Sequence, residues 1–209
     1  MTGKEIMIKE QLIARGIDDE RVLGAMRNTE RENFVPDDVK HLAYRDSPLP
    51  IGKGQTISQP YIVAYMAQAL DLQTYDKMLE VGTGCGYNAA VLSKLASHVY
   101  TIEIIEWLAE YARENIEKAE IKNVSVKYDD GYSGWPEKAP FDHILFTAAT
   151  PSIPDSLKKQ LKIGGKILAP IADTIQKLSL YQKIGEDDFT VNDLLQVRFV
   201  PMTGEVRKK

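Results

Sequence analysis

The sequence predicts an α/β fold whose core is a mostly parallel, twisted sheet. From residue 77 onward, short apolar runs alternate with segments of helical periodicity, and such alternation is typical of parallel strands joined by right-handed crossovers. The first apolar run leads into Gly82-Thr83-Gly84-Cys85-Gly86, a glycine-rich turn of the kind that joins a strand to a helix beside a nucleotide. Two later apolar runs around an acidic turn predict a C-terminal antiparallel pair, as many mixed sheets have.

Helices and an irregular segment are expected before the sheet. Residues 4–16 carry apolar side chains at helical spacing, and Asp18-Asp19 are a candidate cap for a second helix. Residues 36–60 hold four prolines and two glycines, which predicts an extended, irregular segment. A helix resumes over residues 61–70. The apolar residues of the irregular segment are expected to pack, namely Leu49, Ile51 and Ile57.

The sheet and its helices account for the rest of the chain. Parallel strands are predicted over residues 77–81, 98–103, 123–128, 141–147 and 165–171, and the antiparallel pair over residues 177–184 and 189–200. Helices between them are predicted over residues 86–96, 106–119 and 154–162. Gly164-Gly165 are expected to end the last of these helices, because glycine is the usual residue just past a helix C-terminus.

Composition limits the partners and the compartment. The chain has 209 residues and a formal net charge of −4, so it lacks the basic footprint of a nucleic-acid-binding protein. No apolar run approaches the ~20 residues of a membrane span, and the amino end is charged rather than signal-like. The single cysteine fits a reducing compartment. We therefore expect a cytoplasmic monomer that binds neither nucleic acid nor membrane.

Three acidic residues stand near strand ends, where a nucleoside would bind. Glu80 precedes the glycines, Glu103 ends the next predicted strand about 20 residues on, and Asp130 follows the third strand. Carboxylates at these places could accept hydrogen bonds from ribose hydroxyls or an adenine amine. A dinucleotide fingerprint needs a third glycine where Tyr87 stands, so the pattern favours S-adenosylmethionine over NAD. The alternatives are an ordinary tight turn, a solvated strand end and a turn-forming Asp-Gly.

A second candidate segment lies upstream of the glycines. Residues 52–60 place hydroxyl and amide groups in a stretch rich in helix breakers. The alternative to a functional role is a helix cap, since Ser58 or Gln59 could precede a helix that starts at Pro60, and both interpretations can hold. Cys85 has no visible partner base, so a small packing role is favoured. The histidines show no metal-ligand spacing, and structural roles are favoured for His98 and His143.

The quoted residues also resemble a known family over nearly the whole chain, the protein-L-isoaspartate O-methyltransferases. Residues 79–90 are similar to a motif that many methyltransferases share, and Gly54-Gln55-Thr56-Ile57-Ser58-Gln59-Pro60 resembles the family's own substrate-side signature. Further segments that resemble family sequence are residues 31–36, 43–50, 130–135, 160–165 and 199–202. Asp129 departs from the family, which often has glycine there.

The resemblance implies a Rossmann-like methyltransferase fold with an N-terminal helical extension. It implies methyl transfer from S-adenosylmethionine to the free α-carboxyl of L-isoaspartyl residues in aged proteins and peptides. The resulting ester can close to a succinimide and reopen, which partly restores aspartate. We expect one domain over residues 1–209, divided into N-terminal helices with a substrate-side segment (1–75), a cofactor core (76–172) and C-terminal strands (173–209).

Roles for single residues follow from the same resemblance. Ser58 would be the active-site serine, Glu103 would bind the ribose and Asp130 the adenine. Val200 and Pro201 would help to hold the substrate. The full expected set of cofactor-binding residues is Gln55, Thr56, Ile57, Ser58, Glu80, Gly82, Gly84, Glu103, Asp130, Gly131 and Thr147. No metal site is expected.

The expected chemistry needs no strong base. An acceptor carboxylate with a pKa near ~3.5–4 is already ionised at pH 7, which agrees with the absence of histidine from residues 55–61. Ser58 is better interpreted as a donor that orients the carboxylate than as a nucleophile, and residues 36–60 as a cover over the methyl donor. Alternatives are a methyltransferase of the same fold acting on a small molecule or RNA, a non-catalytic S-adenosylmethionine-binding protein, and, remotely, an NAD dehydrogenase.

Overall fold

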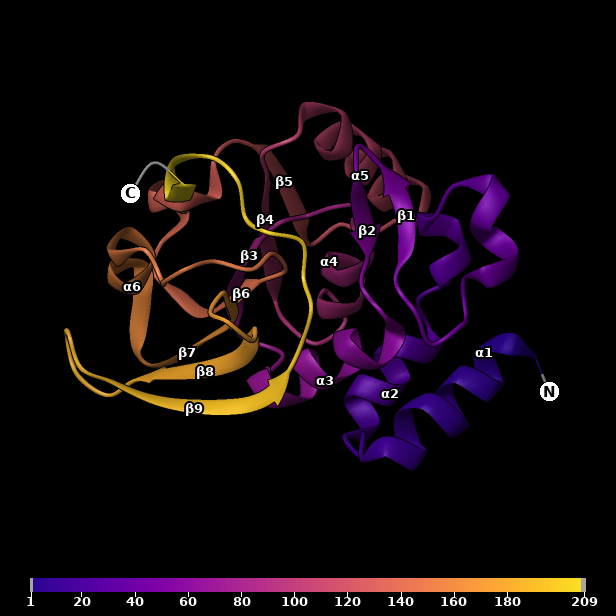
Figure 1. Cartoon of the computed structure of the whole chain (residues 1–209), viewed down its shortest axis with the longest axis horizontal. Coiled ribbons are helices and arrows are strands. Elements are labelled where there is room, and N and C mark those ends of the chain that lie inside the picture. Colours follow the sequence, from indigo (N-terminus) through magenta and orange to yellow (C-terminus); the bar gives the residue numbers. More distant parts are fainter. Residues whose placement is uncertain (1, 208–209) are drawn as a thin grey trace.

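A seven-stranded sheet forms the centre of the protein, for which the computed structural model describes residues 2–207 (Figure 1). The strand order is β5-β4-β3-β6-β7-β8-β9, and the first five of these strands are parallel while β8 and β9 are antiparallel. The predicted α/β fold class is confirmed. The strands are β3 (Lys77–Val81), β4 (His98–Glu103), β5 (Val124–Tyr128), β6 (Phe141–Phe146), β7 (Leu161–Ile171), β8 (Lys177–Lys183) and β9 (Phe189–Gln196).

Helices cover both faces of the sheet, with α4 and α5 on one side and α6 on the other (Figure 1). Each face has its own hydrophobic cluster, and neighbouring residues of β3 serve both, since Met78 belongs to one cluster and Leu79 to the other. Alternate side chains of a strand point to opposite faces, so a strand buried on both faces is apolar throughout. The helices are α3 (Pro60–Leu70), α4 (Tyr87–Leu92), α5 (Glu106–Lys118) and α6 (Asp155–Gln160).

The N-terminal helical prediction is confirmed, with a change of helix type. The chain runs through α1 (Gly3–Ile6), a π-helical stretch (Met7–Leu12) and a 3₁₀ turn (Ile13–Arg15). Asp19 caps α2 (Glu20–Arg27), because its carboxylate accepts a hydrogen bond of 2.8 Å from the Arg21 backbone N–H. Residues of these helices pack in the same hydrophobic cluster as α3 and α4.

The segment 36–60 is more regular than predicted. After 3₁₀ turns at Arg31–Phe34 and Asp37–Leu42, it forms an antiparallel hairpin of β1 (Leu49–Gly52) and β2 (Gln55–Ile57). The hairpin turn uses left-handed backbone at Gly52, Lys53 and Gly54, with φ of 92°, 52° and 72°. The expected packing is confirmed by the buried side chains of Leu49, Ile51 and Ile57.

Several predicted boundaries are wrong. Helix α6 ends at Gln160, and Gly164-Gly165 lie inside β7, where the pairing with β6 shifts register and Gly164 has a φ of 87°. Helix α4 stops at Leu92 instead of residue 96. Strand β9 stops at Gln196 instead of residue 200. The residues that follow, 197–202, leave the sheet and cross the carboxyl ends of the parallel strands (Figure 1); we call them the strap.

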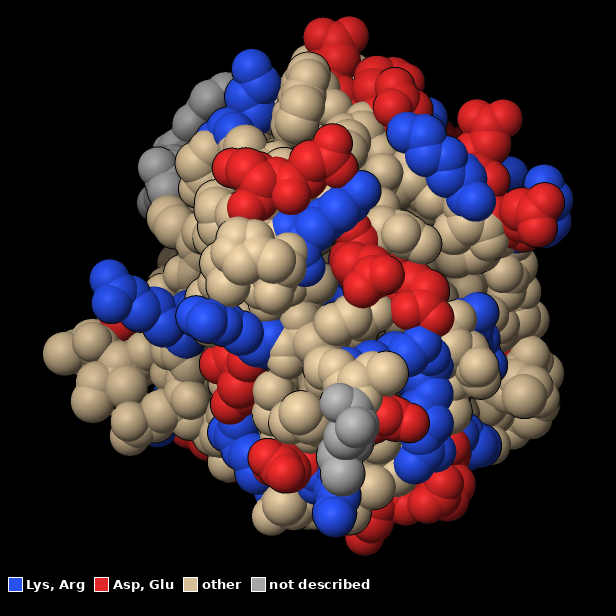
Figure 2. Space-filling model, turned by 90° about the vertical axis from the view of Figure 1, so that its right-hand side faces the viewer, with Lys and Arg blue, Asp and Glu red and all other residues tan. Residues whose placement is uncertain are grey.

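Surface charge, helix length and the grouping of metal-binding side chains bear on nucleic-acid, membrane and metal binding, respectively. Acidic and basic side chains mix over the face seen in Figure 2, so this face carries no extended field of one sign. Within residues 2–207, no helix has the length and apolar character needed to cross a membrane. The same part of the chain holds no group of three or more His, Cys, Asp or Glu side chains placed to bind a metal ion.

Candidate functional site

A cleft lies at the carboxyl ends of β3, β4 and β6, between the β1–β2 hairpin and the strap. About 850 Å³ of space between these elements is not filled by protein atoms, and part of it is open to solvent. Ligands of open α/β sheets bind at this edge. The predicted residues that line it are Gln55, Thr56, Ile57, Ser58, Gly82, Gly84, Glu103, Gly131, Thr147, Val200 and Pro201.

The glycine turn forms the floor of the cleft. Gly82, Gly84 and Gly86 have φ of 101°, 57° and 87°, a backbone conformation that residues other than glycine rarely adopt. A Cβ on Gly84 would come within 3.3 Å of Ile51, so the hairpin packs directly on this turn. The Thr147 hydroxyl donates to the Gly82 carbonyl on the other side. The glycines therefore let Ile51 and Thr147 pack against the turn, and Gly82 and Gly84 also line the cleft.

Glu103 presents a rigid carboxylate at the end of β4. Its Oε2 accepts a hydrogen bond of 2.8 Å from the Gly84 N–H, and its Oε1 accepts one of 3.0 Å from the Ile105 N–H. Only 6% of its surface is exposed. Burial raises the pKa of this carboxyl, and the backbone N–H groups partly oppose that shift. Each carboxylate oxygen has two lone pairs, so Glu103 can still accept hydrogen bonds from the two hydroxyls of a ribose.

Glu80 does not line the cleft, but it accepts a hydrogen bond from Asn88, which does. The Glu80 carboxylate is fully buried and accepts hydrogen bonds of 2.6 Å from Asn88 Nδ2 and from Thr101 Oγ1. Burial raises its pKa to about 7 despite these donors. Asn88 lines the cleft, and its Oδ1 is buried without a hydrogen-bond partner within residues 2–207. Asn88 was not among the predicted site residues. The signal that could have found it is an amide side chain in the first turn of α4, a helix whose other residues are mostly apolar.

Asp130 stands beside the cleft with its carboxylate already engaged. Its Oδ1 accepts a hydrogen bond of 2.9 Å from the Tyr132 N–H, and its Oδ2 accepts one of 2.7 Å from the Glu205 N–H. The adjacent Gly131 lines the cleft, whereas Asp130 does not. Asp130 thus ties the loop after β5 to the segment beyond the strap, and its predicted contact with adenine stays a prediction.

Ser58 stands where the cleft meets a second hollow. Thr56, Ser58, Thr147, Val200 and Pro201 line both spaces. Helix α3 starts at Pro60, as the cap interpretation expected, but Gln59 and not Ser58 holds the N-cap position, and its side chain makes no capping hydrogen bond. Within the described part of the chain, no hydrogen bond engages the Ser58 hydroxyl. That hydroxyl is therefore available to a ligand at the junction.

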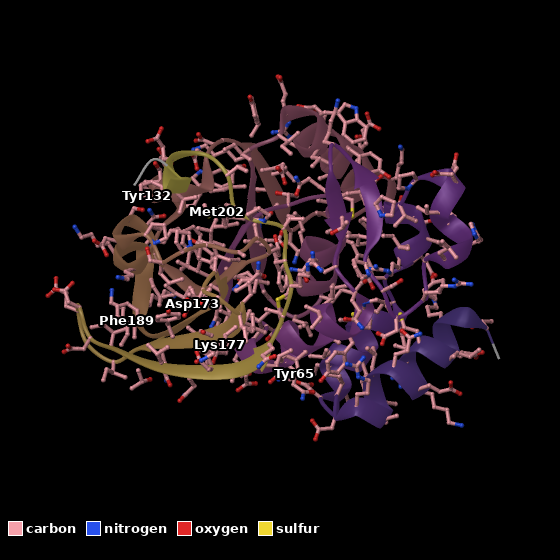
Figure 3. All side chains as sticks on the ribbon, in the orientation of Figure 1. Tyr65, Tyr132, Asp173, Lys177, Phe189 and Met202 are labelled. Atoms are coloured by element: carbon pink, nitrogen blue, oxygen red, sulfur yellow. The ribbon has the colours of Figure 1, made fainter. Side chains whose placement is uncertain are left out.

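The strap is held in place by its backbone. The Ala149 N–H donates to the Val200 carbonyl at 2.8 Å, and the Met202 N–H donates to the Ala149 carbonyl at 2.7 Å. Met202 lies well away from β9, toward the carboxyl edge of the sheet (Figure 3). The Gln176 side-chain amide makes two further hydrogen bonds. It accepts one of 2.7 Å from the Phe199 N–H and donates one of 3.2 Å to the Phe199 carbonyl. The wall made by the strap is thus fixed to β6 and to the start of β8.

Cys85 and the two strand histidines occupy positions that fit structural roles. Cys85 lines the cleft but is buried, which raises its thiol pKa to about 11. His143 Nε2 lies 3.1 Å from an Asp76 carboxylate oxygen, and burial lowers the pKa of this histidine. His98 Nε2 lies 2.9 Å from the Ser125 hydroxyl. Neither histidine lines the cleft, so the favoured structural roles agree with their positions.

Comparisons with known proteins agree with this geometry. A family model described as protein-L-isoaspartate(D-aspartate) O-methyltransferase (PCMT) matches residues 2–207. Protein-L-isoaspartate O-methyltransferase 2 of Pelobacter propionicus is 50% identical over 203 residues, which cover 96% of this chain and 90% of the relative. The corresponding enzyme of Opitutus terrae is also 50% identical, over 204 residues that cover 97% and 87% of the two chains.

Solved structures give the same relationship. A protein-L-isoaspartate O-methyltransferase superposes with a TM-score of 0.90 at 30% identity, covering 97% of this chain and 67% of its own. A candidate enzyme of the same kind from Plasmodium falciparum, solved with S-adenosyl-L-homocysteine, has a TM-score of 0.84 at 26% identity and is covered over 99% of its length, against 97% of this chain. The resemblance stated from the motifs is confirmed, and this chain belongs to the protein-L-isoaspartate(D-aspartate) O-methyltransferase family.

Proposed function

We propose that this protein transfers a methyl group from S-adenosylmethionine to the free α-carboxyl of L-isoaspartyl residues in damaged proteins and peptides, the first step of their repair. One observation carries the proposal beyond family membership. Ser58 lines both the nucleoside-type cleft and a second hollow, and Thr56, Thr147, Val200 and Pro201 are shared by the two spaces in the same way. A methyl donor in the cleft and a carboxylate in the hollow would therefore meet at Ser58.

The residues of the cleft fit the methyl donor. When bound, S-adenosylmethionine supplies an electrophilic methyl group on a sulfonium. Glu103 would accept hydrogen bonds from the ribose hydroxyls, and Gly82 and Gly84 would let the backbone approach closely. The buried acceptor Oδ1 of Asn88, backed by Glu80, fits the α-ammonium group of the donor. The remaining predicted contacts would come from residues of β2, the loop after β5 and Thr147.

The residues near Ser58 would orient the acceptor rather than activate it. A carboxylate oxygen already carries the electron pair that attacks the methyl carbon, so the site needs alignment and exclusion of water. Correct alignment can contribute up to ~7–11 kcal/mol. Ser58 would donate a hydrogen bond to one carboxylate oxygen and leave the other in line with the methyl group. Because opposite charges vanish as the methyl moves, the hairpin over the cleft favours reaction by keeping water out.

We further propose that the protein works as a monomer in the cytoplasm. The sequence has one cysteine, Cys85, and it is a buried free thiol, as expected in a reducing compartment. Light scattering of the purified protein and fractionation of cells that express it test the two statements separately. A stable dimer would contradict the first, and recovery outside the cytoplasm would contradict the second.

A paired assay tests the proposed activity. A peptide with one L-isoaspartyl residue and its twin with ordinary aspartate would be incubated with labelled S-adenosylmethionine. We expect base-labile label on the isoaspartyl peptide only, since a carboxyl methyl ester hydrolyses readily in base. Equal labelling of both peptides would contradict the specificity. Binding of S-adenosylhomocysteine without any transfer would make the protein a non-catalytic binder of the cofactor.

A further inference from the structure

The second hollow, which we call the outer hollow, carries a single formal charge. Among the described residues that line it, Arg198 is the one that is charged, and the others are polar or apolar. Arg198 lines the outer hollow and is absent from the wall of the cofactor cleft. The lining consists of Pro48, Thr56, Ser58, Gln59, Ile62, Thr147, Ile175, Gln196, Val197, Arg198, Phe199, Val200 and Pro201.

The Arg198 side chain is exposed and makes no hydrogen bond or ion pair with residues 2–207. Its backbone, in contrast, is held on both sides. The Val197 N–H donates to the Gln176 carbonyl at 3.0 Å, and the Gln176 amide pairs with the backbone of Phe199. The acid of neighbouring β9, Asp193, is already engaged by Lys177 and Ser179, each at 2.7 Å. The backbone around Arg198 is thus fixed at the rim of the outer hollow, and its guanidinium has no carboxylate partner among the described residues.

We propose that Arg198 binds a carboxylate side chain of the substrate that flanks the isoaspartyl residue, so that the enzyme prefers isoaspartyl sites beside Asp or Glu. This inference rests on the proposed function. The isoaspartyl carboxylate itself belongs at Ser58, where the two spaces meet, and Arg198 lies outside that junction. A guanidinium pairs with a carboxylate through two parallel N–H···O bonds. The single positive charge of the hollow therefore selects an acidic flank.

Peptides that differ at one flanking residue test this inference. Each peptide is acetylated and amidated, so that terminal charges play no part, and carries Glu, Gln or Lys before or after the isoaspartyl residue. The measured quantity is kcat/KM at saturating S-adenosylmethionine. For at least one flank we expect Glu to exceed Gln by about two- to fivefold, as for an exposed ion pair. The ratio should shrink toward one when salt shortens the screening length from ~10 Å at 0.1 M to ~3 Å at 1 M.

Variants of Arg198 assign the preference to this residue. Arg198→Gln should bring the Glu:Gln ratio to one, Arg198→Glu should favour Lys over Gln, and Arg198→Lys should retain part of the original preference. Lys94→Gln is the matched control, because Lys94 is an exposed cation just after α4, outside the lining of both spaces. It changes the net charge equally and should leave every ratio unchanged. Equal affinity for S-adenosylhomocysteine in all variants shows that the cleft is intact.

The outcomes separate this inference from the proposed function. A wild-type enzyme without flank preference, or an Arg198→Glu variant with the wild-type preference, overturns the role of Arg198 and leaves isoaspartyl methylation standing. A preference that changes equally in Lys94→Gln also overturns it, because the cause is then net charge. Failure to methylate any isoaspartyl peptide overturns both.

Discussion

Burial of Glu80 makes folding stability fall as the pH rises through neutrality. Burial raises the pKa of its carboxyl from 4.5 to about 7, although Thr101 and Asn88 donate hydrogen bonds to it. Between these two values the folded protein keeps a proton that the unfolded chain has released. This contribution to stability is therefore fully present below pH ~4.5 and is lost as the pH rises through about 7. The whole shift corresponds to ~3 kcal/mol.

The variant Glu80→Gln tests the size and the sign of this effect. Glutamine keeps the shape of the protonated acid but cannot ionise. Between pH 5.5 and 8.5, the wild-type free energy of unfolding should fall by ~2 kcal/mol more than that of Glu80→Gln. Urea unfolding at both pH values measures the difference. The control Glu117→Gln removes an exposed carboxylate and should follow the wild type. Parallel curves for wild type and Glu80→Gln would refute the reasoning.

Three further predictions concern the cleft, the junction and the domain. Glu103→Gln should weaken S-adenosylhomocysteine binding about ten- to a hundredfold by loss of a charged acceptor; an unchanged dissociation constant in calorimetry would remove Glu103 from the ribose site. Ser58→Ala should lower the single-turnover rate on an isoaspartyl peptide on the order of 10²-fold at unchanged S-adenosylhomocysteine affinity; a normal rate would exclude the orienting role. One domain over residues 1–209 should unfold in one transition; two calorimetric transitions would contradict it.

Local pattern was sufficient to predict the parallel sheet. Strands such as β3 are buried on both faces, so they are rich in apolar residues, here Met78, Leu79 and Val81, and stand out between amphipathic helices. The position of Glu103 could be predicted for a related reason, because parallel strands all end at one edge and the acid closes its strand. Both inferences depend on neighbours in the sequence and on a general property of parallel sheets.

The features that sequence reasoning missed depend on side-chain contacts that form only when the chain folds. Gly164-Gly165 were expected to end a helix, yet α6 stops earlier at Gln160, whose amide is bound to the backbone of Ser133 and Trp135. The role of Asn88 depends on Glu80, which lies eight residues earlier on the preceding strand β3 and is reached only because the glycine turn brings α4 back against that strand. In both cases the sequence shows the residues but not the hydrogen bond that joins them.

The strap lies late in the chain, so a newly synthesised protein acquires this wall of the site after the others. The glycine turn, Glu103 and Thr147 leave the ribosome before residues 197–202, because synthesis runs from the N-terminus. A nascent chain that has reached Thr147 contains β3, β4 and β6, at whose ends the cofactor side of the cleft lies, but it still lacks Val200 and Pro201, which line both spaces together with Ser58. Translation itself therefore withholds the substrate-side wall until nearly all of the chain that forms the cleft has been made.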